Sequence, residues 1–184
     1  MRRREALKTA LGCVLEVGFG TGLNLPYYPS TIDSLTTLDV AKMIPFRVEK
    51  RLDEVSFAVK QIIAQEGKAF PFEDDQFDCV VTTWTLCSVN EPGYFLSEIN
   101  RVLRPDGDYI FLEHGRASNN NTAAWQRRLS WASQLLAKGC RMDCQIAKMV
   151  EQSGFRIMAL NRFVGDSPIG LASHMYQGTA RIGR

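Results

Sequence analysis

The segment CVLEVGFGTGLNLPYYP, residues 13–29, runs from an apolar stretch into the turn Glu-Val-Gly-Phe-Gly-Thr-Gly and then to the polar Asn24, where a helix is expected to begin. Glycines at a strand-to-helix turn let the backbone approach a ligand closely, because no Cβ blocks it. A dinucleotide site needs Gly-x-Gly-x-x-Gly or Ala, but Leu23 or Leu25 takes the last place here. A phosphate loop is also excluded, because no Gly-Lys-Ser/Thr follows and a carboxylate would face the phosphates.

The carboxylate of Glu16 stands two residues before the first glycine and favours a cationic ligand at this turn. Among nucleoside cofactors, S-adenosylmethionine carries positive charge on its sulfonium sulfur and on its α-ammonium group. The turn therefore predicts a protein that binds S-adenosylmethionine.

The same turn resembles the glycine motif of the class I S-adenosylmethionine-dependent methyltransferases, in particular the methyltransferase type 11 group. The resemblance continues at Asp39, at AFPFEDDQFDCVVTTWTLCSV (residues 69–89) and at EINRVLRPDGDYIFLEHG (residues 98–115). These segments follow the order that the family has and cover most of the chain, so together they are specific. The resemblance implies an α/β fold: a Rossmann-like three-layer sandwich whose mostly parallel sheet ends in an antiparallel strand pair. It also implies one domain over residues 1–184, with a shortened N-terminal helical region.

Apolar runs of strand length alternate with helix-like stretches along the chain, which is typical of a parallel sheet covered on both faces. The pattern predicts strands at residues 13–17, 35–38, 56–63, 78–85 and 109–113, and helices at residues 92–103 and 125–136. Residues 156–163 and 174–182 are two further strand-like runs with no helix between them. By resemblance they form the closing antiparallel pair.

The composition is that of an ordinary enzyme domain, with 184 residues, 45% hydrophobic and 23% charged. A net charge of +2 is too small to indicate a nucleic-acid partner. The basic run at residues 2–4 is interpreted as a solvated helix start, with peripheral contact to an anionic membrane left open. No run approaches the ~20 apolar residues of a membrane span. A secretory signal is rejected because its cleavage would destroy the glycine turn, and five cysteines favour a reducing, cytoplasmic location.

The resemblance places the cofactor at the carboxyl ends of the strands, as open α/β sheets do with their ligands. The glycine turn is expected under the methionine part, and Asp39 is expected to accept hydrogen bonds from the ribose, although it also suits a helix N-cap before Ala41. The expected cofactor-binding residues are Glu16, Gly18, Phe19, Gly20, Gly22, Asn24, Asp39, Val40, Glu66, Gly67, Thr83 and Leu86. Glu66 takes the place of the family's adenine-binding acid, without the usual Asp-Ala pair. Met43 is expected either on the adenine or in the core.

Methyl transfer depends mostly on aligning the nucleophile, the methyl group and the sulfur in a dry pocket. A base is needed only if the acceptor arrives protonated. Glu113 and His114, at the carboxyl end of the fifth strand, are the expected catalytic pair. An equal alternative is that His114 caps the loop at residues 116–121.

The five cysteines are interpreted as free core residues, and no metal site is expected. Cys140 and Cys144 stand one helical turn apart and could share a metal ion with the distant His114 and His174, but zinc sites usually have more tightly paired spacings. Cys87 as a nucleophile is also set aside, because no base accompanies it in the sequence.

Residues 123–143, 153–155 and 174–178 resemble the thiol methyltransferases, the ubiquinone and menaquinone C-methyltransferases, and bacterial phospholipid N-methyltransferases. The resemblance implies a small or lipid-like acceptor: a thiol, a quinone-like ring or a lipid amine. Because residues 2–11 alone precede the first strand, the site is expected either to be open or to be covered by the second subunit of a homodimer. A non-catalytic nucleotide-binding protein that retains the fold is the alternative, and the intact motif residues disfavour it. A nucleic-acid methyltransferase would show Asn-Pro-Pro-Tyr after the fourth strand, where this chain has Thr-Trp-Thr-Leu.

Overall fold

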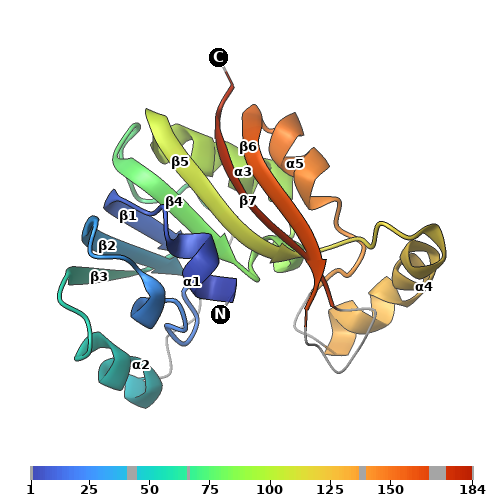
Figure 1. Ribbon diagram of the computed structural model, residues 1–184, viewed down its shortest axis with the longest axis horizontal. Coiled ribbons are helices and arrows are strands. Elements are labelled where there is room, and N and C mark those ends of the chain that lie inside the picture. Colours follow the sequence, from blue (N-terminus) through green and yellow to red (C-terminus); the bar gives the residue numbers. More distant parts are fainter. Residues whose placement is uncertain (1, 41–44, 66, 137–139, 166–172, 184) are drawn as a thin grey trace.

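The computed structural model of the protein describes residues 2–40, 45–65, 67–136, 140–165 and 173–183. In this part of the chain a single seven-stranded sheet crosses the molecule (Figure 1). The strands are β1 (Gly12–Val17), β2 (Ile32–Asp39), β3 (Ala58–Ile63), β4 (Phe77–Thr83), β5 (Leu103–His114), β6 (Phe155–Val164) and β7 (His174–Ile182).

The strand order is β3-β2-β1-β4-β5-β7-β6. β1 to β5 pair in parallel, whereas β7 is antiparallel to both β5 and β6. This confirms the expected mostly parallel sheet with a closing antiparallel pair. The order reverses between β1 and β4, and a crevice outside the carboxyl ends of strands is expected at such a switch point.

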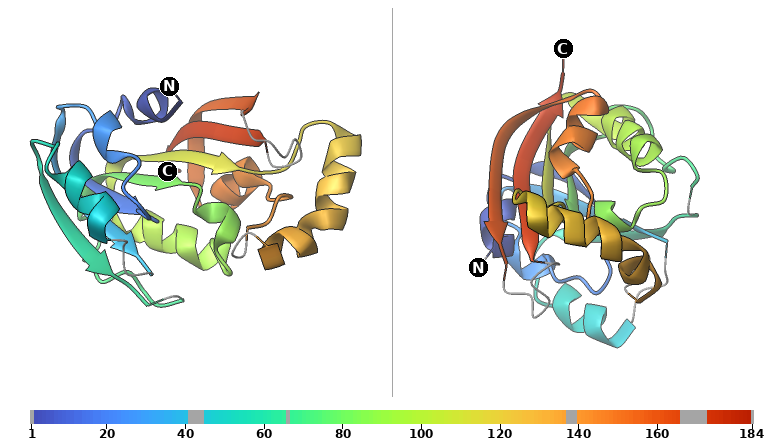
Figure 2. Two further views of the ribbon diagram at one scale, coloured as in Figure 1. Left: turned by 90° about the horizontal axis from the view of Figure 1, so that it is seen from below. Right: turned by 90° about the vertical axis from the view of Figure 1, so that its right-hand side faces the viewer.

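Helices cover both faces of the sheet (Figure 2). α1 (Arg2–Leu7) and α2 (Pro45–Leu52) share a buried core with one face, while α3 (Pro92–Val102) and α5 (Ile146–Gln152) pack on the other. α4 (Asn120–Leu136) lies at the side of the molecule opposite α2 (Figure 1). Two single turns of 3-10 helix, η1 (Leu25–Tyr27) and η2 (Leu86–Ser88), follow β1 and β4. The three-layer arrangement is therefore present.

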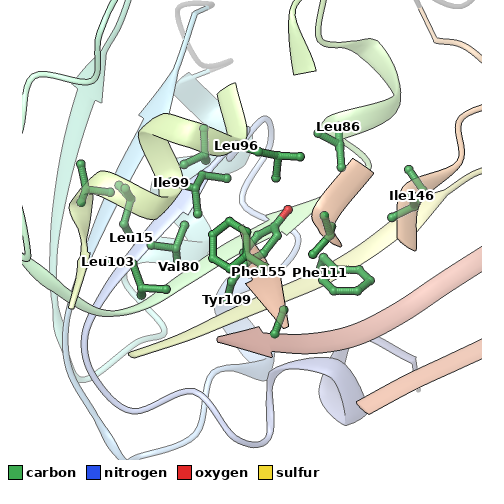
Figure 3. Close-up of a cluster of buried hydrophobic side chains, with 14 of the residues drawn as sticks. Leu15, Val80, Leu86, Leu96, Ile99, Leu103, Tyr109, Phe111, Ile146 and Phe155 are labelled. Atoms are coloured by element: carbon green, nitrogen blue, oxygen red, sulfur yellow. The ribbon is translucent and has the colours of Figure 1, made fainter. Parts of the chain in front are cut away.

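The central strands are buried on both faces because successive residues along each strand point into different cores. In β4, Val80 packs with Tyr109 and with Leu96 and Ile99 of α3 (Figure 3). Val81 points the other way, into the core that α1 and α2 share. Burial of each large aliphatic or aromatic side chain is worth roughly 1.5–3 kcal/mol, which explains why these strands appear in the sequence as continuous apolar runs.

Two expected boundaries were wrong for identifiable reasons. The helix expected at Asn24 is only the single turn η1, because Pro29 disfavours helical backbone at Tyr28, which is extended at φ −67° and ψ 135°. The fourth strand ends at Thr83 and not at residue 85, because Trp84 takes the left-handed conformation, with φ 57°. β2 and β5 are longer than expected.

Candidate functional site

A cavity of about 660 Å³ opens at the carboxyl ends of the central parallel strands. Its wall includes Gly18 after β1, Asp39 and Val40 at the end of β2, Gly67 after β3, and Trp84 after β4. The volume is within the range of pockets that hold cofactors and other small ligands. The structure thus brings four of the expected cofactor-binding residues to one cavity at the switch point.

The three motif glycines all have positive φ: 81° at Gly18, 57° at Gly20 and 69° at Gly22. A Cβ at Gly18 would overlap the side chain of Thr85, and one at Gly22 would meet the ring of Phe19 at 3.0 Å. A Cβ at Gly20 would have no protein atom within 4 Å. The outer two glycines are therefore required by the packing of the protein, whereas Gly20 faces open space.

Asp39 fixes the same turn from the neighbouring strand. Its Oδ2 accepts a hydrogen bond from the backbone N–H of Gly20 at 2.7 Å. This contact holds the glycine turn against the end of β2, beside the cavity. The proposed helix start at Ala41, the expected contact of Met43 and the expected contact of Glu66 lie outside the described residues.

Glu16 lies beneath the turn and is 1% exposed. Asn24 Nδ2 donates to its Oε1 at 2.9 Å, and the hydroxyl of Tyr28 donates to its Oε2 at 2.7 Å. Burial raises the pKa of Glu16 to about 7, although these hydrogen bonds and the charge of Arg3 act in the opposite direction. Glu16 therefore organises the polar interior under the glycine turn.

Arg3 joins the polar group under the glycine turn, which the sequence did not predict. From α1 its guanidinium donates to Asn24 Oδ1 at 2.6 Å and to Thr83 Oγ1 at 3.1 Å. The run of arginines was interpreted as a solvated helix start, and nothing in its spacing distinguishes the one that turns inward. Only the packing of α1 on the sheet brings Arg3 to the ends of β1 and β4.

Two expected cofactor residues belong to the cores instead of the cavity wall. Phe19 is 3% exposed and packs in the core of α1 and α2, while Leu86 is fully buried on the other face. Glycine motifs do not show the direction of the residues between the glycines, so the sequence could not separate Phe19 from its neighbours.

Glu113 is fully buried and holds the turn after β4. Its Oε2 accepts the backbone N–H groups of Thr85 at 2.9 Å and Leu86 at 3.1 Å. Burial raises the pKa of this carboxyl to about 7, against the effect of the backbone hydrogen bonds. Glu113 thus positions the segment that carries Trp84 and does not itself line the cavity.

His114 lies behind Trp84 and is 1% exposed. The two rings stack with centroids 5.8 Å apart and planes 16° apart, and Trp84 lines the cavity. His114 Nδ1 is 3.3 Å from Cys140 Sγ, which is in turn 3.5 Å from Cys87 Sγ. His114 Nε2 is buried and has no hydrogen-bond partner within the described ranges. The structure therefore groups His114 with Cys140 and with Cys87, whereas the sequence pattern had suggested Cys144 as the neighbour of Cys140.

None of the described helices combines the length and the apolar character that a bilayer crossing requires.

Comparison with known proteins finds similar methyltransferases. Residues 15–111, more than half of the chain, match a family described as a methyltransferase domain. The phosphatidylethanolamine N-methyltransferase of Cereibacter sphaeroides is 30% identical over 162 residues, which are 83% of this chain and 79% of that protein. The human thiol S-methyltransferase TMT1A is 31% identical over 150 residues, which are 80% of this chain but only 61% of TMT1A.

Among solved structures, a similar fold occurs in the 1,6-didemethyltoxoflavin N1-methyltransferase of Burkholderia thailandensis, whose crystal structure contains S-adenosylhomocysteine. The two folds superpose with a TM-score of 0.67 over 100% of this chain and 77% of that chain, at 16% identity. At this identity the likeness supports the fold alone.

Proposed function

Because this chain belongs to the methyltransferase domain family and is an S-adenosylmethionine-dependent methyltransferase, we propose that it transfers the methyl group to a small, apolar acceptor. The observation that carries the proposal is Trp84. This indole is 45% exposed, lines the cavity and stands on backbone with φ 57°. A bulky residue in that conformation costs roughly 1–2 kcal/mol, and such strain is characteristic of functional sites.

The aromatic wall continues on α3. Tyr94 is 40% exposed, and it lines the cavity together with Phe95 and Phe70. An apolar acceptor that binds against these rings is transferred out of water. This transfer provides affinity without any charged contact. The names of the relatives, one acting on a lipid amine and the other on a thiol, are compatible with an acceptor of this kind.

We infer that the cofactor lies across the glycine turn. Gly20 leaves space for it, and its ribose hydroxyls donate hydrogen bonds to Asp39, whose Oδ2 already accepts the N–H of Gly20. Gly18, Val40 and Gly67 complete this side of the cavity. The arrangement leaves the Trp84 side of the cavity for the acceptor.

In the reaction the bond between the methyl carbon and the sulfonium sulfur breaks as the bond from the acceptor atom to that carbon forms. The products are S-adenosylhomocysteine and the methylated acceptor, which loses a proton if it carried one. Because neither Glu113 nor His114 lines the cavity, we assign both to positioning: Glu113 holds the turn after β4, and His114 supports Trp84. Alignment in a dry pocket then supplies most of the rate.

The test is transfer of a labelled methyl group to matched acceptor pairs. In each pair the same kind of reacting atom is carried once by an apolar molecule and once by a charged one. The thiol pair is a long-chain alkanethiol and mercaptoacetate, and the quinol pair is a prenylated and a sulfonated quinol. The amine pair is phosphatidylethanolamine in vesicles and phosphoethanolamine. Several buried methylene groups, each worth ~0.8 kcal/mol, should favour the apolar member of the reactive pair by about ten-fold or more in kcat/KM.

Trp84→Ala should remove most of that preference by raising the KM for the apolar acceptor. The matched control is Trp131→Ala, since Trp131 is 65% exposed on α4 and does not line the cavity. Equal or faster methylation of the charged members would contradict the proposal.

A further inference from the structure

Three side chains with metal-binding atoms converge behind Trp84. Cys87 comes from η2, His114 from the end of β5, and Cys140 from the segment before α5. Cys140 Sγ is 3.5 Å from Cys87 Sγ and 3.3 Å from His114 Nδ1, and all three ligand atoms lie within 4.8 Å of one another. The cluster is separate from the cavity wall, because none of its members lines the cavity.

Two of the three separations are close to the edges of a tetrahedral metal centre. With Zn–S near 2.3 Å and Zn–N near 2.0–2.1 Å, two ligand atoms on one tetrahedral zinc ion lie roughly 3.5–3.8 Å apart. The two measured separations are within a few tenths of an ångström of that range. We propose that Cys87, His114 and Cys140 bind one thiophilic divalent metal ion such as zinc.

Contacts that do not involve the three ligand atoms position the segments that carry them. The N–H of Arg141 donates to the carbonyl of Cys87 at 2.9 Å, and its guanidinium donates to the carbonyl of Val89 at 2.8 Å, so the segment with Cys140 is attached to η2. Glu113 fixes the start of η2, and the stacked Trp84 fixes the plane of His114. The ligands therefore come from a rigid frame, as a metal site requires.

The donor set also suits the burial of the site. Cys87 and His114 are each 1% exposed, and Cys140 is partly exposed. Binding of a divalent cation releases one proton from each thiol and leaves two thiolates and a neutral imidazole around it, so the centre carries no net charge. A neutral centre avoids the cost of an isolated buried ion. Two thiolates and an imidazole favour zinc over the oxygen-seeking cations magnesium and calcium.

Three protein ligands leave the fourth position for water or for a soft exogenous ligand, which is the pattern of zinc centres with an open position. The ion would join η2, the end of β5 and the segment at Cys140, all on the acceptor side of the cavity. This inference does not depend on the nature of the acceptor.

The experiment is metal analysis of the full chain, purified under reducing conditions from zinc-supplemented cells and dialysed. We expect about one zinc ion per chain by plasma mass spectrometry. Cys87→Ser and Cys140→Ser should each reduce the bound zinc at least ten-fold. Cys144→Ser is the matched control, because Cys144 is also buried and near but does not belong to the cluster, and it should retain the metal.

Two measurements on the unaltered protein keep the test valid if a variant fails to fold. Cobalt(II) exchanged into the site should give the intense near-ultraviolet band of thiolate-to-cobalt charge transfer. Bound zinc should protect the partly exposed Cys140 from alkylation until a chelator removes the metal, while the partly exposed Cys13 is labelled in both states. The absence of stoichiometric metal and of the cobalt band would overturn the proposal. So would a Cys87–Cys140 disulfide in metal-free protein, or loss of the metal in Cys144→Ser alone.

Discussion

Gly20 differs from the other two glycines of its turn in what surrounds it. Gly18 and Gly22 are confined by protein side chains, whereas the space beside Gly20 contains no protein atom within 4 Å. The sequence motif alone does not distinguish the roles of the three glycines. The structure therefore separates the two glycines that the packing of the turn requires from the one that faces open space.

Gly20→Ala should weaken S-adenosylmethionine binding by ten-fold or more, because the added Cβ occupies the cofactor's space. Because alanine would have to adopt the positive φ of 57° found at Gly20, the substitution also destabilises the folded state by roughly 1–2 kcal/mol. Gly154→Ala is the control, since Gly154 has φ 85° and lies at the start of β6, far along the sheet from the turn. Calorimetry should show a changed Kd only for Gly20→Ala, and a Kd within two-fold of the wild type would refute the assignment.

The buried carboxyl of Glu16 makes a testable contribution to stability. Its pKa rises from an ordinary 4.5 to about 7 on folding, so between these values the folded chain binds more protons than the unfolded chain. The contribution of this protonated carboxyl to the free energy of unfolding is fully present below pH 4.5 and is lost as the pH rises through about 7.

Glu16→Gln removes this titration and leaves that of Glu113 in both proteins. The free energy of unfolding of the wild type minus that of the variant should therefore decrease from pH 5 to pH 8. Urea unfolding of both proteins at several pH values measures the difference. A difference that stays constant would show that Glu16 ionises at its ordinary pKa.

At the scale of elements, the apolar runs predicted where all seven strands lie along the chain, and the family resemblance supplied the antiparallel pairing of the last two. The register of the central strands follows from packing, because a shift by one residue would exchange side chains such as Val80 and Val81 between two different cores. The boundaries that were missed depend on single residues. β4 ends because Trp84 has a left-handed φ, which the sequence around Trp84 does not predict. Pro29 limits η1 to a single turn.

The candidate site was predictable where one local motif supplied it, as at Gly18 and Asp39. It was not predictable where packing unites distant segments. Arg3 reaches Asn24 and Thr83 across 21 and 80 residues of sequence, and Cys87 meets Cys140 across 53. These contacts follow from the strand order, which no local pattern encodes.

The turn after β4 depends on one carboxylate, and its removal should affect acceptor binding more than the cofactor. Glu113→Ala would leave two backbone N–H groups without their acceptor, at roughly 1–3 kcal/mol each. We expect a lower Tm and a raised acceptor KM, since Trp84 precedes the freed segment. Glu113→Gln keeps a carbonyl oxygen and should restore both, as a positioning role requires. Failure of Gln to restore KM, with the fold intact, would instead indicate that the charge itself acts in the reaction.

At the scale of the whole molecule, the cavity joins segments that follow four different strands. Turns after β1, β2, β3 and β4 all contribute to its wall, on both sides of the switch point. A ligand that binds there contacts segments that otherwise interact mainly through the sheet. Cofactor binding should therefore stabilise the entire fold and not one loop.

S-adenosylmethionine or S-adenosylhomocysteine at a hundred times its Kd should add about 2.7 kcal/mol to the free energy of unfolding. For a chain of 184 residues this corresponds to a rise in Tm of roughly 5–10 °C. NAD and ATP at the same concentration should produce no shift, because the turn lacks both the dinucleotide spacing and the phosphate-loop lysine. Thermal unfolding with each ligand measures this, and at the same ligand concentration Gly20→Ala, with its Kd raised ten-fold, should show only about half of the Tm shift of the wild type or less. An equal shift with NAD would mean that the glycine turn accepts a pyrophosphate, and the prediction that this turn selects S-adenosylmethionine over a dinucleotide would then be wrong.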